Sequence, residues 1–461
     1  MNLSLAAFAL AVGLLGAAPE ARAIDPEPLT LLSPNQLRQD LTFLQNILFK
    51  THPDIHFSAN AAELRAGFIK VEEELVRPMT RDQVWRLFST LNPVFADGHV
   101  SVLNPDPRAQ TSALLKSGRG LFPFEVSVEP TGVVFVLSEL GGAPSSYAAA
   151  SIKSLNGVPI QELTRALLAR TNGDTAAFRA VNLSTRWWWF YWKVFGTPET
   201  YEIELKTPSG TAVARVPASR TTPSDLTDSD ASNFDGAFRF WSMSEDVAVL
   251  TVNTFNWADK KRFYAFTERV FLGLRDAKTK TLVIDIRKNG GGDDDMWKEG
   301  ILRYIATKPY RHGSSFLLRV IEGRQRDGQK AGDLVEGQIQ SWVQPMQDER
   351  LLFRGKVYVL VGGATYSSAV LFANVVQDFG FAKVVGVSGY ARTRQSGGTQ
   401  TYTLPNSQLQ IVVPRFILDR PSGARDPKFL APDVPLNDNP LDSEQVWTSL
   451  RTLLIADTAK K

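Results

Sequence analysis

Two adjacent serines, Ser367 and Ser368, stand where an apolar run at 356–363 gives way to a stretch with helical spacing. A serine at such a strand-to-helix turn can act as a nucleophile, but its hydroxyl is not ionised at neutral pH and needs a base. Serine is also a favoured N-cap residue, so the pair is equally consistent with an ordinary helix start. The pattern therefore indicates a nucleophile only if the chain also supplies a base.

Few bases are available to such a serine, because the chain has four histidines and no cysteine. Without cysteine, thiol nucleophiles, Cys-ligated zinc and iron–sulfur clusters are excluded. His52 and His56 flank a proline that interrupts the spacing a two-histidine metal site would need, and His312 lies in a connecting segment. His99 instead lies on a Gly turn that enters a predicted strand. A histidine titrates near neutral pH, so His99 is the candidate base, although a lone histidine is more often structural.

A run of glycines at 290–292 follows the apolar segment at 281–286 and precedes a predicted helix. Glycines at a strand end let backbone N–H groups converge on a ligand, where they can stabilise an oxyanion. The alternative is a flexible turn with no role. No Gly-Lys-Ser/Thr follows, which disfavours a phosphate loop. The acidic residues at 293–295 suit the charge of a helix start and do not by themselves indicate a metal.

Hydrophobic spacing predicts a helical N-terminal unit at 24–105. In its first helix the leucines recur at three- and four-residue intervals: Leu37, Leu41, Leu44 and Leu48. Residues 106–220 instead contain short apolar segments and an Asn-Gly turn, which is typical of a small β-rich module. Within that module, RWWWFYWKVFG at 186–196 lacks clean periodicity. It fits core packing or, alternatively, an apolar substrate groove.

The rest of the chain predicts a separate α/β core. Residues 221–235 are polar, acidic and rich in turn residues, which indicates a linker or exposed loop. From 236 to 461 predicted strands and helices alternate, a pattern typical of a partly parallel sheet. A chain of 461 residues is also too long for one ordinary domain. We therefore predict an α/β multidomain protein.

The first 23 residues stand apart from the rest of the chain. An apolar run there ends in Ala21-Arg22-Ala23, which predicts a secretory signal cleaved after Ala23, with a retained N-terminal anchor as the alternative. No other stretch is apolar for the roughly 18 residues that a membrane span needs. The net charge of +3 comes without a long basic block, so a nucleic-acid partner is not expected. We expect an exported protein, periplasmic or extracellular, with no membrane span after cleavage.

Four segments, taken together and in this order, resemble the tail-specific, or C-terminal processing, serine peptidases: 285–292, 362–387, 404–414 and 431–434. The N-terminal helices, with their HP and DGH motifs, resemble the same family more loosely. The resemblance implies a ClpP/crotonase-like α/β core and a PDZ-like middle module. It also implies a peptide or unfolded protein as substrate, with no cofactor and no metal.

The family nucleophile matches the serine that follows Ala-Thr-Tyr, which is Ser367. One branch of the family places a lysine base downstream, but here that position is Arg392, and arginine holds its proton too tightly for a base. The chain more closely resembles the tricorn-core branch, in which a histidine is the base, and His99 matches it. Asp426, in RDPKFLAPD, matches the acidic residue of that branch, where Glu is usual.

The resemblance further implies that the backbone N–H groups of Ser368 and of Gly291 or Gly292 form the oxyanion hole. We predict a serine peptidase in which Ser367 attacks, His99 moves the proton and Asp426 orients His99. Two alternatives use the same fold: a catalytically inactive binding protein for apolar ligands or peptides, and an esterase-like hydrolase. Fold alone does not decide between them. The oligomeric state is not predicted.

The leader predicted at 1–23 leads to a direct test. N-terminal sequencing of the protein recovered from outside the cytoplasm should begin at Ile24, because the Ala-x-Ala sequence ends at Ala23. Mature, membrane-free protein that still begins with Met1 would contradict this prediction.

Overall fold

The structure is a computed structural model that describes residues 30–208, 210–228 and 233–459. The leader predicted at 1–23 lies outside the described residues. Within the described ranges, no helix combines the length and the apolar character that crossing a bilayer requires.

A six-stranded sheet forms the centre of the C-terminal core, in the order β19-β14-β13-β10-β9-β8. The strands are β8 (Phe238–Ser242), β9 (Val247–Val252), β10 (Thr281–Asp285), β13 (Lys356–Val361), β14 (Lys383–Gly386) and β19 (Val434–Pro435). Neighbours run parallel except β8, which pairs antiparallel with β9. The parallel strands read as nearly continuous apolar runs because helices cover both faces of the sheet. The predicted α/β class is thereby confirmed.

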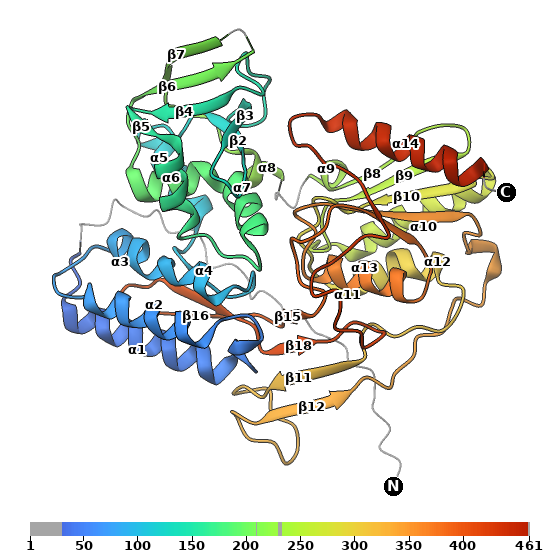
Figure 1. Cartoon of the computed structure of the whole chain (residues 1–461). Helices are drawn as coiled ribbons and strands as arrows, with labels where there is room; N and C mark the ends of the chain where they lie inside the picture. The colour runs from blue at the N-terminus through green and yellow to red at the C-terminus, as the bar shows by residue number, and fades with distance from the viewer. Residues whose placement is uncertain (1–29, 209, 229–232, 460–461) are drawn as a thin grey trace.

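Helices cover the two faces of this sheet, as Figure 1 shows. On one face lie α10 (Lys260–Asp276) and α13 (Ser368–Asp378), whose apolar side chains join the largest buried cluster. On the other face α14 (Ser443–Ala459) packs Val446 and Leu450 against the strands. Two shorter helices, α11 (Asp294–Trp297) and α12 (Arg303–Ile305), follow β10. The end of β13 and the start of α13 are therefore held between packed layers.

The N-terminal unit consists of α1 (Pro34–Thr51), α2 (Ala61–Glu73), α3 (Arg81–Phe88) and α4 (Asn92–Phe95). The predicted leucine spacing of α1 is confirmed, since all four of those leucines are buried. The core of this unit is completed from far along the chain. Strand β1 (Ser101–Leu103) pairs with β17 (Gln410–Val413), which pairs with β16 (Gln400–Thr403). Figure 1 shows this hairpin beside the helices, whereas the sequence pattern had assigned the whole of 236–461 to the C-terminal core.

The middle module contains a five-stranded path, β2-β3-β4-β6-β7, with β5 paired to β4. Its elements are β2 (Phe124–Val128), β3 (Val134–Glu139), β4 (Ser151–Leu155), β5 (Val158–Pro159), β6 (Thr200–Thr207), β7 (Gly210–Pro217), α5 (Pro107–Lys116), α6 (Ile160–Leu168) and α7 (Ala176–Phe195). The aromatic run lies in α7. Trp187, Trp188 and Trp189 are each at least 94% buried, which favours core packing over a substrate groove.

The segment predicted as a linker contains regular structure. Helix α8 (Ser224–Asp228) lies within it and α9 (Phe234–Ala237) begins in it. Leu226 and Phe234 are buried, because they pack against the middle module and the core respectively. The polar composition of this segment therefore gave no indication that Leu226 and Phe234 would be buried.

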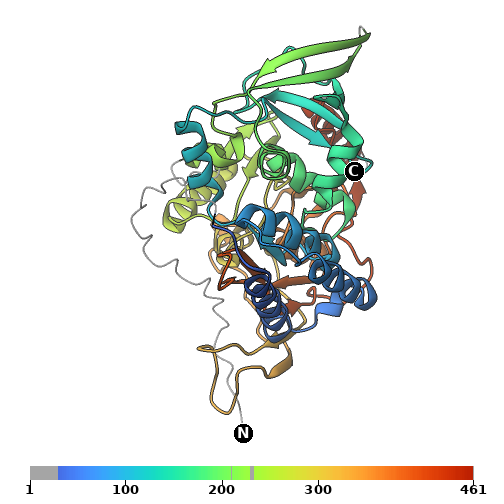
Figure 2. The ribbon, with the colours of Figure 1, turned by 90° about the vertical axis from the view of Figure 1, so that its left-hand side faces the viewer.

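A four-stranded sheet, β12-β11-β18-β15, completes the structure. Its strands are β11 (Ser315–Arg319), β12 (Leu334–Gln338), β15 (Gln395–Gly397) and β18 (Phe416–Leu418). Figure 2, viewed from the side of the N-terminal helices, shows the loop of the β11–β12 hairpin projecting from the body of the molecule. Strand β15 brings the residues after Arg392 to the DGH segment, so this sheet is part of the scaffold of the site.

Candidate active site

Ser367 occupies the turn between β13 and α13 with a φ of 53° and a ψ of −124°. A positive φ is costly for a residue with a side chain, and such strain is often found at functional sites. Ser367 is in the N-cap position of α13, but its side chain makes no capping hydrogen bond. Its Oγ lies 3.0 Å from Nε2 of His99, 268 positions away in the sequence. The structure therefore favours the nucleophile over the simple helix cap.

The other nitrogen of His99 fixes which tautomer faces the serine. Nδ1 lies 3.0 Å from Oγ of Ser396, and that oxygen lies 2.9 Å from Oδ1 of Asp97. An ionised carboxylate only accepts, so Ser396 must donate its single proton to Asp97 and accept from Nδ1–H of His99. The lone pair of Nε2 is then free to accept the proton of Ser367. This is the tautomer that a general base requires.

Local geometry explains the Asp-Gly-His sequence. Ala96 has a φ of 49°, which turns the chain so that Asp97 Oδ1 accepts the backbone N–H of His99 at 2.8 Å. Gly98 packs so tightly that a Cβ there would lie 2.6 Å from the ring and hydroxyl oxygen of Tyr366. Tyr366 precedes the nucleophile, and its ring centroid is 4.8 Å from that of His99. Only glycine lets the histidine turn and the nucleophile turn approach each other this closely.

Asp174 ties three segments of the site together. Its Oδ1 accepts the backbone N–H of Gly98 at 2.9 Å and the hydroxyl of Tyr366 at 2.8 Å. Its Oδ2 accepts the backbone N–H of Arg392 at 2.8 Å, and the Arg392 guanidinium lies 3.3 Å from Oδ1. Asp174 directly precedes Thr175, the N-cap residue of α7. One buried carboxylate therefore joins the base turn, the nucleophile turn and the segment leading to β15.

Arg392 stands where one branch of the family has a lysine, and the structure gives it a different role. Its side chain is 5% exposed, and it donates to the carbonyl of Ala96 at 2.6 Å while it pairs with Asp174. Lys383, the nearest lysine in sequence, extends from β14 to Asp457 at the surface, with an Nζ–Oδ2 distance of 2.6 Å. Neither cation contacts the serine hydroxyl in the described structure, so neither is placed to act as its base.

The assignment of Asp426 as the orienting acid needs correction. Asp426 is exposed, and Nδ1 of His99 faces Ser396 and Asp97 instead. The peptide from Asp426 to Pro427 is cis, in a loop that follows β18. Within the described chain we find no hydrogen bond that joins Asp426 to His99. The carboxylate that faces Ser396 and His99 is that of Asp97, two residues before His99 in the same motif, so the resemblance at RDPKFLAPD did not identify it.

Burial and charge set the protonation of this cluster. Burial lowers the pKa of His99, while the charges of Asp97 and Asp174 raise it in part. Burial alone would raise the pKa of Asp97, but the neighbouring His52 and His99 bring it well below the usual range. Burial and the nearby Asp97 raise the pKa of Asp174. Because every hydrogen-bonding neighbour of Asp174 donates, its carboxylate form is the one whose contacts are satisfied.

Two of the predicted oxyanion residues, Ser368 and Gly291, lie beside the nucleophile, and Gly292 directly follows Gly291. Ser368 is the first residue of α13, so its N–H has no partner within the helix. Gly291 packs against this turn, since a Cβ there would lie 2.6 Å from Cβ of Ser367. The N–H of Gly291 already donates to Asn289 Oδ1 at 2.9 Å, whereas for the N–H of Gly292 we find no acceptor among the described residues. Of the two glycines, Gly292 therefore has the available donor.

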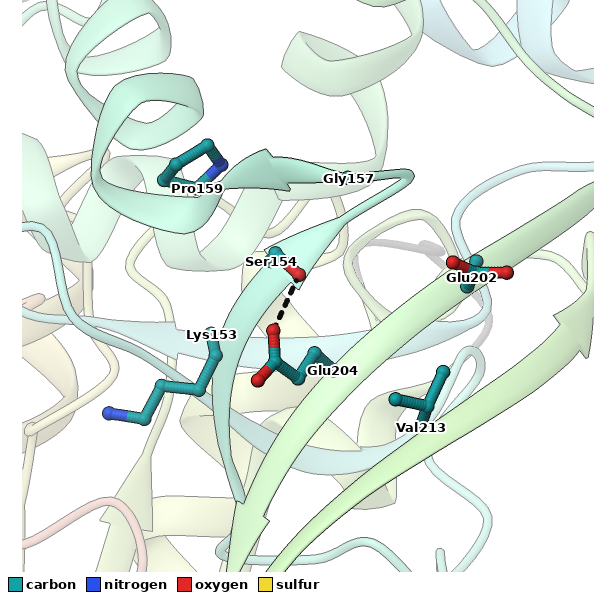
Figure 3. Close-up of a pocket in the computed structure, with 7 residues that line it drawn as sticks. All are labelled: Lys153, Ser154, Gly157, Pro159, Glu202, Glu204 and Val213. Atoms are coloured by element: carbon teal, nitrogen blue, oxygen red, sulfur yellow. Dashed lines mark hydrogen bonds between the residues drawn. The ribbon is translucent and has the colours of Figure 1, made fainter.

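Three other features could indicate a functional site: a metal-binding cluster, the remaining histidines and a surface hollow. Within the described chain, no group of three or more His, Asp or Glu side chains is arranged to hold a metal ion. His56 is exposed and His312 is buried away from the cluster, where burial lowers its pKa to about 4. The hollow of about 420 Å³ drawn in Figure 3 lies on β4 and β6 of the middle module, between Lys153 and Glu202. It contains none of the predicted site residues.

Comparison with known proteins gives a family and a fold. The model of Peptidase family S41 matches residues 246–436, which include Ser367 and the glycine run. No curated protein matches the sequence. The crystal structure of mature CPAF is 13% identical with a TM-score of 0.64, covering 91% of this chain and 96% of that chain. Mature CPAF complexed with lactacystin is 14% identical with a TM-score of 0.64, covering 93% and 98% respectively.

The corrected position of the acid gives a matched pair of substitutions. Asp97→Asn should lower turnover by about 10³-fold or more, because the amide can donate to Ser396 and so disturb the tautomer of His99. Asp426→Asn should leave turnover within about twofold of the wild type, because surface changes away from a site usually have small effects. Hydrolysis rates of both variants, measured beside their thermal unfolding, check this. A severe loss in Asp426→Asn with a mild loss in Asp97→Asn would restore the original assignment.

Proposed function

We propose that in this serine-type peptidase of family S41, whose family model matches residues 246–436, Ser367 is the nucleophile and His99 the base. Asp97 orients His99 through Ser396. The observation that carries the proposal is the continuous hydrogen-bonded chain from Ser367 through His99 and Ser396 to Asp97, with no step longer than 3.0 Å.

The first chemical step follows from the tautomer of His99. Nε2 removes the proton of Ser367 while Oγ attacks the scissile carbonyl carbon, which forms an Oγ–C bond and an oxyanion. The N–H groups of Ser368 and Gly292 are available to receive that oxyanion, and each such donor typically contributes about 10²–10³ in turnover. The protonated His99 then gives its proton to the leaving amine as the C–N bond breaks. Water repeats the sequence to release the acyl group.

Charge balance in the cluster supports the same direction of proton movement. Asp97 and Asp174 are both buried, and Arg392 is the cation that pairs with Asp174. With His99 neutral, these three charged groups carry one net negative charge. Protonation of His99 therefore compensates a buried charge, which favours the imidazolium that forms as the serine attacks.

The substrate and the location are further parts of the proposal. A serine-type peptidase acts on peptides or proteins, and we infer that this one acts on peptides or unfolded chain ends. The leader predicted at 1–23 supports export, so the substrate would be met in the periplasm or outside the cell. The inactive binding protein is less favoured, because a pure binder does not need a base and a strained serine in contact. An esterase-like hydrolase would use the same residues on a smaller acyl substrate.

A fluorophosphonate probe tests the assignment without knowledge of the natural substrate. Labelling should occur at Ser367, be absent in Ser367→Ala and fall by about 10³-fold or more in His99→Ala, because triad members act as a unit. The exposed Lys383→Ala variant is the control and should label at the wild-type rate. The rate should rise with pH through one limb below pH 6.5, because burial lowers the pKa of His99 and the neutral form is the base.

Two results would reject this assignment. Full labelling of His99→Ala would show that another group activates the serine. A loss of labelling in Lys383→Ala would return the enzyme to the lysine branch of the family. Parallel assays with an unfolded protein and with a small acyl ester then separate the peptidase from the esterase-like alternative.

A further inference from the structure

His52 is a buried histidine that the proposed mechanism does not yet use. It follows the last residue of α1 and has extended backbone angles of −69° and 130°, as expected for a residue that precedes a proline. Its Nδ1 accepts the backbone N–H of Asp54 at 3.2 Å. In the neutral ring the proton is therefore on Nε2, which lies 3.6 Å from Oδ2 of Asp97.

Among the described residues, neither of the two facing atoms has a hydrogen-bond partner. Oδ1 of Asp97 accepts from the backbone N–H of His99 and from Ser396, whereas Oδ2 has no hydrogen bond. Nε2 of His52 is likewise buried without a hydrogen-bond partner. Buried polar atoms without partners are costly and rare, so two of them facing each other point to one interaction. An approach of a few tenths of an ångström would complete it.

His52 is held in this place by strands from the C-terminal half of the chain. The guanidinium of Arg319, on β11, donates to the carbonyls of His52 at 3.4 Å and Pro53 at 3.2 Å. Thr51 donates its hydroxyl to Tyr402, on β16, at 3.2 Å. The end of α1 is thereby fixed from two sides, so the imidazole is aimed at Asp97 by the fold rather than by its own flexibility.

We propose that His52 is a positioning residue of this peptidase, whose Nε2–H donates to Oδ2 of Asp97 and so sets the basicity of His99. The proposal rests on the proposed function, because it needs His99 as the base. Asp97 would then have both oxygens occupied, one facing Ser396 and His99 and the other facing His52. The Asp97 carboxylate could not rotate away from the relay without breaking two sets of hydrogen bonds.

The expected consequence is a shift in the pH dependence of the base. Four titratable or charged groups surround the pair of Asp97 and His99: His52, Asp174, Arg392 and the hydroxyl of Tyr366. Burial is the main cause that lowers the pKa of His99; Asp97 and Asp174 raise it, and His52 lowers it further. A carboxylate that loses the donor from His52 holds the imidazolium more strongly. The pKa of His99 should then rise, and the ascending limb of the rate should move to higher pH.

The experiment compares three variants of the full chain by their rate of fluorophosphonate labelling at Ser367 across pH. His52→Leu removes the donor at similar volume, and His52→Gln retains an N–H near the position of Nε2. The exposed His56→Leu is the matched control. We expect His52→Leu to label about 10- to 100-fold more slowly at the pH optimum, the usual range for one hydrogen bond to a charged group. The ascending limb of its pH–rate profile should move to higher pH. His52→Gln should recover most of the lost rate and reverse most of this shift.

Each outcome decides the proposal. If His52→Leu keeps the wild-type limb, or if His52→Gln loses as much rate as His52→Leu with an unmoved limb, His52 has only a structural role and the proposal is overturned. Thermal unfolding of each variant identifies a loss due to folding, which lowers the labelled fraction without moving the limb. If the wild type itself fails to label while folded, the proposed function fails instead, and that result is distinct from an active wild type with an unaffected His52→Leu.

Discussion

The carboxylate of Asp174 is the contact on which the geometry of the site depends. It is buried, and it accepts hydrogen bonds from Gly98, Tyr366 and Arg392, which come from three distant parts of the chain. A buried carboxylate needs such partners, because breaking a buried ion pair costs about 3–5 kcal/mol. The fold therefore cannot bury Asp174 without also bringing the base turn to the nucleophile turn. The 3.0 Å contact of His99 with Ser367 follows from that constraint.

The same buried cluster both holds the parts of the molecule together and forms the candidate site. Its charged groups are buried between the N-terminal helices, α7 of the middle module and the C-terminal core, so all three parts must pack before the site exists. Arg392 neutralises Asp174 and leaves the charge of Asp97 to act on His99. A lysine base is unnecessary in this arrangement, and a flexible cation at position 392 would lose the fixed contact with the carbonyl of Ala96.

The sequence predicted much of this, and its failures have physical causes. Ser367 and His99, which the structure brings within 3.0 Å of each other, were predicted from a strand-to-helix turn, a Gly turn and the family resemblance. The alternating core was predicted from its hydrophobic period. Asp426 was predicted from the family resemblance alone and is exposed, whereas Asp97 of the DGH motif faces Ser396 and His99. Nothing local marks Ser396, since a serine in a short strand looks like any other. Long-range pairs, such as the β16–β17 hairpin with β1, also leave no short-range pattern.

The central claim is that Asp97 acts on His99 through Ser396, and the protonation of the two imidazole nitrogens tests it most directly. We would measure their ¹⁵N chemical shifts by NMR in the full chain, labelled at histidine, above the pH at which His99 titrates. The account predicts a proton on Nδ1 and none on Nε2 in the wild type, and a mixture of tautomers in Ser396→Ala. A wild-type His99 with its proton on Nε2, or a tautomer that Ser396→Ala leaves unchanged, would contradict it.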